Sequence, residues 1–339
     1  MIPVKTILFL DSSLYGGIET HIVELVQLLD SNNINVEVLF YQNHGNKQLY
    51  ENLDSVNCKY GFLDGSVSSL YNFIKNQRVP LCIHTHGYKA GIIGRITCKI
   101  LQVNCVSTFH AGEAGTGLVY LYNVIDKLTS YLSTNFVVSK KLLKQVHKAT
   151  ILNNFVRISH YPKSTKSQSL RVAFVGRLSH EKGPDNFIEL ATCFKKNRNI
   201  SFHLYGDGPM KQTLQQYLPE NVTLHGHQTN NDFWNNVDLL VISSRAEGLP
   251  MVLLEAMARE KCVVSFDVGS VSSVIKNNVN GFICSKNTIE SLQALINAWS
   301  DCKNKDEVTT SAHHTIVKYF SGKKELEVLK AAYNNKLFN

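Results

Sequence analysis

Short runs of β-branched and apolar residues alternate with longer amphipathic segments, and the alternation occurs twice along the chain. The runs are "TILFLDS", "VEVLFY", "LCIHTH", "CVSTFH" and "NFVVS" from residue 5 onward, and "RVAFVG", "SFHLYG", "VTLHGH", "VDLLVIS", "CVVSFD" and "GFIC" from Arg171 onward. Buried strands connected through helices form parallel sheets covered on both faces. The sequence therefore predicts an α/β protein with two Rossmann-like parallel-sheet domains that face a central cleft.

The length of the chain agrees with two domains, because 339 residues exceed the ~150 that one domain commonly holds. A polar stretch without apolar periodicity separates the two series of strands. We expect a first domain over 1–157, a linker over 158–170, a second domain over 171–322 and a C-terminal helix over 323–339.

Several functional classes are disfavoured by composition. No apolar run approaches the ~20 residues of a membrane-spanning helix, and the N-terminus is typical of a buried strand rather than a secretion signal. We therefore expect a cytoplasmic protein. The eight cysteines lack a CxxC pair or a metal-like spacing, so reduced core thiols are expected.

The positive charge is concentrated in the N-terminal half, where residues 1–170 hold 16 Lys+Arg against 10 Asp+Glu. This favours an anionic substrate or an anionic membrane surface as partner, whereas no nucleic acid is expected without an arginine-rich run. The candidate basic surface comprises "KKLLKQVHK" over 140–148 and the helix that carries Lys89, Arg95 and Lys99. The alternative is an ordinary solvated helix face.

Two glutamates flank a predicted helix start in "SSRAEGLPMVLLEAMARE", residues 243–260. The helix is expected to begin at Leu249 or Pro250, and its unpaired N–H groups are suited to bind a phosphate. Glutamates beside an anion site are favourable if they accept hydrogen bonds from the hydroxyls of sugars on either side of the phosphates. Alternatively, Glu247 is a solvated cap of an ordinary strand–loop–helix unit. The predicted donor contacts here are Gly248, Leu249, Pro250, Met251 and Glu255.

Two cations follow the first strand of the second series in "VGRLSHEKG", residues 175–183. Gly176 closes the strand, and Arg177 and Lys182 can together neutralise a diphosphate leaving group in place of a metal ion. No Asp-x-Asp pair is present to hold a divalent metal, so neither a metal nor a cofactor is expected. The alternative is a surface cation pair on a loop.

The first domain offers weaker candidates. Gly16 and Gly17 lie between the first strand and helix, where they either allow a close phosphate approach or form a simple loop. His110 ends a strand and is interpreted as a polar substrate contact or as a core-edge histidine. His84 and His86 could form half of a zinc site, but no third ligand lies at a persuasive spacing.

These segments occur in the order found in one enzyme family. The ordered set is "GGIETH", "STFHAG", "VVSKKL", "ILNNFV", "GRLSHEKGPDNFIEL", "LYGDGPM", "VDLLVISSRAEGLPMVLLEAMA" and "VNGFIC". In this set the chain resembles the family 4 glycosyltransferases, which are retaining enzymes of the two-Rossmann-domain architecture called GT-B. Departures such as Ser270 and Ser273, where the family commonly has "GGVSEVI", leave the donor sugar open.

The resemblance implies a role for each candidate. Arg177 and Lys182 would bind the donor diphosphate, Glu255 the ribose, and Glu247 the transferred sugar, while His110 matches a histidine that contacts that sugar. It also implies an acceptor-binding first domain, a nucleotide-sugar-binding second domain, and a C-terminal helix, from residues 323–337, that packs back on the first domain.

The resulting hypothesis is a metal-independent, retaining hexosyltransferase that moves a sugar from a nucleotide diphosphate, UDP by family habit, to a saccharide or lipid-linked saccharide. By resemblance the setting is bacterial cell-envelope polysaccharide synthesis. The basic charge of the first domain adds the expectation of a peripheral location at the inner face of the membrane. The alternatives are a non-catalytic nucleotide-sugar-binding partner and an epimerase or phosphorylase on the same scaffold.

Overall fold

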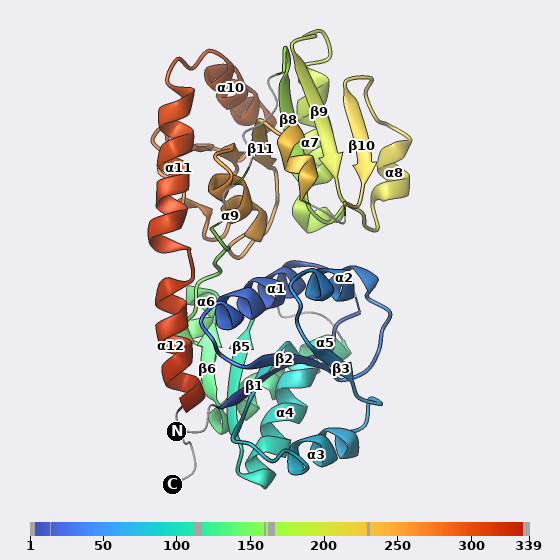
Figure 1. Cartoon of the computed structure of the whole chain (residues 1–339). Coiled ribbons are helices and arrows are strands. Elements are labelled where there is room, and N and C mark those ends of the chain that lie inside the picture. The colour runs from blue at the N-terminus through green and yellow to red at the C-terminus, as the bar shows by residue number, and fades with distance from the viewer. Residues whose placement is uncertain are drawn as a thin grey trace. The chain divides into compact units, whose positions relative to one another are not determined.

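The protein is described by a computed structural model in which the chain divides into two compact units (Figure 1). The first unit comprises Met1–Arg157 and Gly322–Asn339, and the second comprises Ile158–Ser321. The predicted linker over 158–170 falls largely outside the described part of the chain. The structure describes residues 4–13, 15–110, 117–158, 161, 167–228 and 231–334.

The first unit contains a parallel sheet in the order β3-β2-β1-β4-β5-β6-β7. The chain runs outward from β1 to β3 and then crosses back to β4 on the other side of β1, so the direction of winding switches between β1 and β4. The strands are β1 (Lys5–Leu10), β2 (Val36–Phe40), β3 (Tyr60–Phe62), β4 (Leu81–His86), β5 (Asn104–Phe109), β6 (Thr134–Val137) and β7 (Thr150–Ile151).

Helices cover both faces of this sheet because alternate residues of each strand point to opposite faces. Leu8 and Leu10 of β1 pack in one core with α1, α2 and α12, whereas Ile7 and Phe9 pack in another with α3 and α4. The helices are α1 (Gly17–Asp30), α2 (Lys47–Ser55), α3 (Val67–Lys75), α4 (Tyr88–Leu101), α5 (Leu118–Leu128), η1 (Thr129–Leu132), α6 (Lys140–Leu143) and α12 (Lys323–Asn334).

The second unit repeats this plan with the sheet order β10-β9-β8-β11-β12-β13, again with parallel pairs. Its switch point lies between β8 and β11. The elements are β8 (Leu170–Val175), η2 (His180–Lys182), α7 (Pro184–Cys193), β9 (Ile200–Tyr205), α8 (Lys211–Gln215), β10 (Val222–Gly226), η3 (Asp232–Asn236), β11 (Leu239–Ile242), α9 (Met251–Ala258), β12 (Cys262–Ser265), η4 (Val271–Ser273), β13 (Phe282–Ile283), α10 (Ile289–Ser300) and α11 (Lys305–Tyr319).

The last helix, α12, belongs to the first unit although the second unit precedes it in the chain. Leu326 and Leu329 are buried in the core that β1 and α1 share. The hydroxyl of Tyr333 lies 2.8 Å from Nδ1 of His84, and the Asn104 amide donates to the Ala332 carbonyl at 2.9 Å. Residues 335–339, part of the predicted helix, lie outside the described residues.

The predicted fold class, two parallel-sheet α/β domains, is confirmed. The predicted start of α9 is off by one or two residues, because Leu249 precedes a proline and Pro250 is extended, with ψ at 128°, as the N-cap of a helix that begins at Met251. No helix in the described part of the chain is long and apolar enough to cross a membrane.

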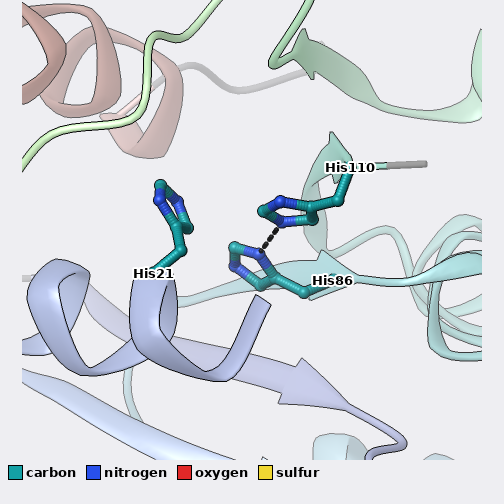
Figure 2. Close-up of side chains that lie close together, drawn as sticks. All are labelled: His21, His86 and His110. Carbon is teal, nitrogen blue, oxygen red and sulfur yellow. Dashed lines mark hydrogen bonds between the residues drawn. The ribbon is translucent and has the colours of Figure 1, made fainter. Parts of the chain in front are cut away.

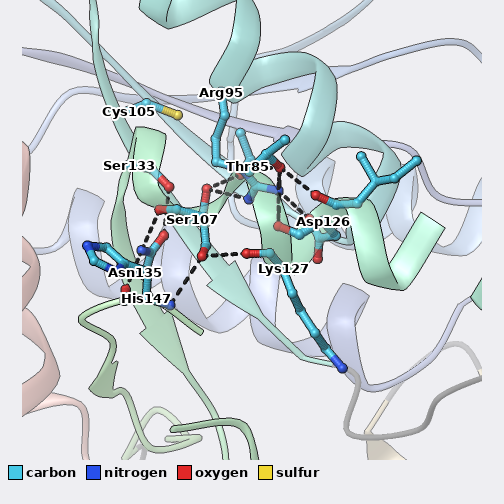
Figure 3. A network of polar contacts seen from close by, with 12 residues as sticks. Thr85, Arg95, Cys105, Ser107, Asp126, Lys127, Ser133, Asn135 and His147 are labelled. Atoms are coloured by element: carbon cyan, nitrogen blue, oxygen red, sulfur yellow. Dashed lines mark hydrogen bonds and ion pairs between the residues drawn. The ribbon is translucent and has the colours of Figure 1, made fainter. Parts of the chain in front are cut away.

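The proposed basic surface on α4 is wrong at Arg95, which is 1% exposed. Figure 3 shows its guanidinium inside a polar network, where it forms an ion pair with Asp126 of α5. It also donates to Ser107 Oγ at 3.1 Å and to Thr129 Oγ1 at 2.8 Å. Arg95 therefore joins α4 to β5, α5 and η1. The 140–148 segment is also less helical than expected, since α6 ends at Leu143.

Candidate active site

The switch point of the second sheet places two loops next to each other. β8 ends at Val175 and its neighbour β11 ends at Ile242, and the loops that follow carry the residues predicted to bind the donor. In open parallel sheets this position beyond the carboxyl ends of the strands is where ligands bind. The loops over 176–183 and 243–250 are therefore the candidate donor site.

An ion pair connects these two loops. Lys182 Nζ donates to both carboxylate oxygens of Glu247, at 2.8 and 2.7 Å, and Ser244 Oγ donates to Oε1 at 2.7 Å. The Glu247 side chain is only 6% exposed and that of Lys182 is 33% exposed. The alternative of a solvated cap at Glu247 is therefore excluded, and Lys182 keeps a third N–H for another acceptor.

A glycine allows the close approach of these loops. Gly183 has φ at +63°, and a Cβ built there would lie 2.2 Å from the carbonyl oxygen of Ser243. The Ser243 hydroxyl in turn donates to the Gly183 carbonyl at 2.8 Å. A side chain at position 183 would separate the loops that Lys182 and Glu247 join.

The first turn of α9 directly follows the loop that carries Glu247, and the N–H groups of a first helical turn have no partner within the helix. Pro250 is the N-cap and provides no side-chain hydrogen bond. Gly248 is exposed, whereas Leu249 and Met251 are buried, so these two can contribute backbone groups and not side chains to a ligand. An uncapped helix N-terminus beside an exposed glycine is suited to an anion.

Arg177 is exposed directly after Gly176 at the end of β8. Among the described residues its guanidinium makes no recorded hydrogen bond or ion pair. Nearby, Arg245 is engaged in a bidentate pair with Asp185 at 2.8 and 2.6 Å, and its backbone N–H donates to the Glu181 carbonyl. Of these two described arginines, Arg177 is therefore available to a ligand, while Arg245 fixes the loop to α7.

Glu255 lies one turn inside α9. Burial raises the pKa of its carboxyl, and the charge of Arg259 partly offsets this effect. A carboxyl group in such surroundings is suited to a neutral, hydroxyl-bearing ligand more than to a second anion.

Of the candidates in the first unit, Gly16 is the N-cap of α1 and Gly17 its first residue, and both are exposed. The first turn also holds a buried acid, because Glu19 accepts a hydrogen bond from Ser12 at 2.6 Å. Burial raises the pKa of Glu19. This carboxyl makes the start of α1 less favourable to an anion than the start of α9.

Three histidines gather at the carboxyl ends of β4 and β5 (Figure 2). His86 Nδ1 lies 3.0 Å from His110 Nε2, and the ring of His21, from α1, lies 5.1 Å from that of His110. His21 is fully buried, and neither of its nitrogens has a hydrogen-bond partner among the described residues. Residues 111–116, which continue the predicted motif after His110, lie outside the described residues.

Burial keeps this cluster neutral. It lowers the pKa of His21 to about 4, and it lowers the pKa of His86 and of His110 well below the ordinary value, with neighbouring histidines adding to the effect on the latter two. His84, next to His86, is hydrogen-bonded through Nδ1 to the Tyr333 hydroxyl and through Nε2 to the Thr108 hydroxyl, both at 2.8 Å. His110 therefore presents a neutral ring, which can donate or accept a hydrogen bond.

The fold thus provides the third histidine that the sequence spacing did not show. One ligand nitrogen from each of His21, His86 and His110 lies within 4.8 Å of the others. Two nitrogens bound to one zinc ion at ~2.0–2.1 Å cannot be more than about 4.2 Å apart, so the cluster would have to contract to hold a metal. Its hydrogen bond and neutral rings are those of a polar contact site.

Within the second unit the structure joins Lys182 to Glu247, and it places Gly176 and Arg177 at the end of β8, next to the strand that leads to α9. Gly16, Gly17 and His110 lie in the first unit. Sequence reasoning missed Ser244, Arg245 and His21 as site residues. His21 ends the "GGIETH" segment, and that placement was the available signal.

Models of two families match the chain. The model described as "Glycosyltransferase Family 4" matches residues 15–158, and that described as "Glycosyl transferases group 1" matches residues 158–313. A similar curated protein is the UDP-Gal:alpha-D-GlcNAc-diphosphoundecaprenol alpha-1,3-galactosyltransferase of Escherichia coli, 25% identical over 319 residues that cover 81% of this chain and 80% of the relative. The poly(ribitol-phosphate) alpha-N-acetylglucosaminyltransferase of Staphylococcus aureus is 30% identical over 42% of this chain and 30% of its own length.

Solved structures show the same fold. Anabaena Alr3699/HepE in complex with UDP superposes with a TM-score of 0.80 at 17% identity, over 97% of this chain and 100% of the other. Sucrose-phosphate synthase from Thermosynechococcus elongatus superposes with a TM-score of 0.77 at 14% identity, over 97% and 98% of the two chains. Because the two family models together match the chain from residue 15 to residue 313, and its fold is that of GT-B enzymes, this chain belongs to the family 4, group 1 glycosyltransferases.

Proposed function

We propose that this glycosyltransferase moves a hexose from a UDP-sugar to a saccharide or lipid-linked saccharide, with retention of anomeric configuration, in bacterial cell-envelope polysaccharide synthesis. The observation that carries the proposal is the donor site at the β8–β11 switch, where Lys182 is fixed by Glu247, Arg177 is exposed and α9 begins without a cap. The names of the similar proteins support the setting, since the Escherichia coli relative uses UDP-Gal and a diphosphoundecaprenol-linked sugar.

The donor is held by its charged centre. Arg177, Lys182 and the first amides of α9 bind the diphosphate, and Glu255 accepts the ribose hydroxyls. Glu247 orients the transferred sugar while it positions Lys182. These donors are preorganised, so they stabilise the charge that develops on the departing diphosphate more than the charge of the bound substrate.

In the reaction, the bond between the anomeric carbon and the diphosphate oxygen breaks, and the acceptor oxygen attacks on the same face. The proton of the acceptor hydroxyl passes to the leaving phosphate oxygen. Glu247 does not act as a nucleophile, because both of its oxygens accept hydrogen bonds from Lys182. His110, as a neutral ring, contacts a hydroxyl of the transferred sugar. No metal is assigned a step.

The donor proposal is tested by the melting temperature of the purified protein with UDP, GDP and ADP. UDP at about 100 times its Kd should stabilise the protein by about 2.7 kcal/mol, because it binds only the native state. Arg177→Ala and Lys182→Met should lose this shift. The matched control Arg198→Ala removes an exposed cation of the same unit and should retain it.

A shift with GDP or ADP in place of UDP would contradict the donor assignment, and no shift with any nucleotide would favour a non-donor role. Release of UDP from UDP-sugars then separates the reaction classes. A transferase releases UDP in proportion to added acceptor, whereas an epimerase converts its substrate without one.

A further inference from the structure

Acidic residues are nearly absent from a long part of the first unit. Residues 65–157 contain eleven Lys+Arg and only two Asp+Glu, Glu113 and Asp126. Asp126 is buried in its ion pair with Arg95, and Glu113 lies outside the described residues. The described surface of this segment therefore carries exposed cations, such as Lys99, Lys144 and Lys148, without exposed anions.

The same segment exposes large apolar side chains. Nine of the sixteen exposed large hydrophobic residues recorded for the described chain fall between residues 96 and 143. Single exposed hydrophobic residues are ordinary, but a concentration on neighbouring elements marks an interaction surface. The most exposed are Ile100 at 66%, Tyr120 at 54%, Leu121 at 52%, Leu128 at 65% and Tyr131 at 68%.

These side chains lie on elements that pack together. α4 and α5 are neighbours whose contact includes Tyr88 stacked on Tyr122 at 5.7 Å and the buried Arg95–Asp126 pair (Figure 3). Leu121 and Leu128 are two helical turns apart, so they share one face of α5. The apolar groups and Lys99 are thus carried by two packed helices. Lys127 of α5 donates to Gln145 Oε1 at 2.7 Å, which places the segment with Lys144 and Lys148 beside α5.

We propose that this surface docks onto the headgroup region of an anionic lipid bilayer. It is formed by exposed residues of α4, α5 and the segments that follow them: Ile96, Lys99, Ile100, Val119, Tyr120, Leu121, Tyr122, Leu128, Tyr131, Lys144 and Lys148. The proposal extends the proposed function, because a lipid-linked acceptor is presented at a bilayer. Tyrosines and leucines insert at the boundary between headgroups and acyl chains, and lysines pair with anionic lipids.

The charge of the surface favours a bilayer over other occupants. A second copy of the chain would bring the same excess of lysines against it, and that repulsion opposes a symmetric dimer. Anionic headgroups neutralise many lysines at once without requiring a specific partner residue. Exposed apolar side chains and exposed lysines on neighbouring elements are the composition of an interfacial surface.

The test is cosedimentation of the full-length protein with vesicles, without donor or acceptor. Vesicles of phosphatidylcholine with roughly one third phosphatidylglycerol should bind the protein, and pure phosphatidylcholine should bind far less. Raising the salt from ~0.1 M to ~1 M shortens the screening length from about 10 to 3 Å and should release much of it. The double change Leu121→Ser with Leu128→Ser should weaken binding on the order of tenfold or more.

Matched changes elsewhere control for loss of apolar or positive groups. Tyr217→Ser with Val279→Ser removes two residues of the second unit that are 73% and 55% exposed, and should bind like the wild type. Lys144→Gln with Lys148→Gln should reduce binding about tenfold or more. Lys195 and Lys196 are exposed in the second unit, and the double change Lys195→Gln with Lys196→Gln should leave vesicle binding unchanged.

Circular dichroism melting and the UDP-induced shift, measured on the same preparations, establish that each variant is folded. The proposal is overturned if the wild type does not bind anionic vesicles at low salt. It is also overturned if the α5 variant, Leu121→Ser with Leu128→Ser, binds them as the wild type does. Dimerisation that the α5 variant abolishes, with vesicle binding unchanged, would instead assign the surface to a second copy. Failure of the UDP shift with intact vesicle binding would contradict the donor proposal alone.

Discussion

The Glu247 carboxylate is held by three hydrogen bonds, two from Lys182 and one from Ser244. This arrangement fixes the orientation of the carboxylate and keeps a cation beside the start of α9. Each side chain is already ordered by the other, so both lose less conformational entropy when a charged ligand binds. The pair thus combines the two roles that the sequence assigned separately to Glu247 and Lys182.

His21 should make the first unit sensitive to acid. Burial lowers its pKa to about 4, whereas the unfolded chain titrates near the ordinary value of about 6.5. Between these values the unfolded state binds a proton that the folded state does not, so the free energy of unfolding decreases as the pH falls. From pH 7 to pH 5 this one residue should lower it by about 2 kcal/mol.

Urea unfolding of the wild type and of His21→Gln at several pH values measures this contribution, with circular dichroism as the probe. The variant should show a pH dependence that is smaller by about that amount, whatever its stability at pH 7. His314→Gln, an exposed position in the second unit, should leave the curve unchanged. Equal pH dependence in the wild type and in His21→Gln would show that His21 does not titrate as its burial requires.

The loop between β8 and α7 depends on a glycine that the sequence alone did not single out. Gly183→Ala should destabilise the second unit by more than the ~1 kcal/mol that a left-handed alanine costs, because its Cβ would also meet the Ser243 carbonyl at 2.2 Å. It should also weaken the UDP-induced shift, since Lys182 immediately precedes it. Tryptophan fluorescence during urea unfolding measures the loss.

Gly226→Ala separates the clash from the strain. Gly226 has φ at +71°, but a Cβ there meets nothing within 4 Å, so the change should cost only the ~1 kcal/mol of conformational strain. If the two variants lose equal stability and both retain the UDP shift, the contact of Gly183 with Ser243 does not hold the donor loops together.

The long, buried strands and amphipathic helices could be predicted from the sequence. A strand buried on both faces is a continuous apolar run, and a helix packed on a sheet has apolar residues along one face. The short edge strands β3 and β7, of three and two residues, carry too few side chains to show a period. The exact start of α9 depends on the backbone of one proline, and a residue before proline is restricted for reasons that periodicity does not reflect.

The candidate site was predictable where its residues are close in sequence and not where the fold joins distant ones. Arg177, Lys182 and Glu247 lie in loops after strand ends and Glu255 lies in the helix that follows, so each could be proposed individually. Their pairing could not, since Lys182 and Glu247 are 65 residues apart. Likewise His21 meets His110 only because α1 and β5 pack in one unit, and the burial of Arg95 depends on an acid 31 residues further along.

The first unit is completed by the last described helix of the chain. The chain leaves this unit at Arg157, forms the second unit, and returns at Gly322. α12 contributes Leu326, Leu329 and Tyr333 to a core with strands from the first third of the sequence. The first unit therefore cannot bury its full core until α12 is available.

Leu329→Ala should consequently destabilise the first unit and leave the second unchanged. Leu329 is fully buried, and loss of such a leucine costs about 2–5 kcal/mol through lost burial and the cavity that remains. Both tryptophans, Trp234 and Trp299, lie in the second unit, so fluorescence reports that unit while circular dichroism reports both. In urea unfolding, part of the circular dichroism transition should move to a lower urea concentration, while the midpoint of the fluorescence transition stays unchanged.

Val328→Ala is the matched control on the same helix, because Val328 is 39% exposed and its truncation should cost under about 1 kcal/mol. If the fluorescence transition of Leu329→Ala moves together with the circular dichroism transition, the two units unfold as one and α12 stabilises both. If neither moves, α12 is not needed for the core of the first unit. Movement of the circular dichroism transition alone would show that the C-terminal helix stabilises the unit to which the N-terminus belongs.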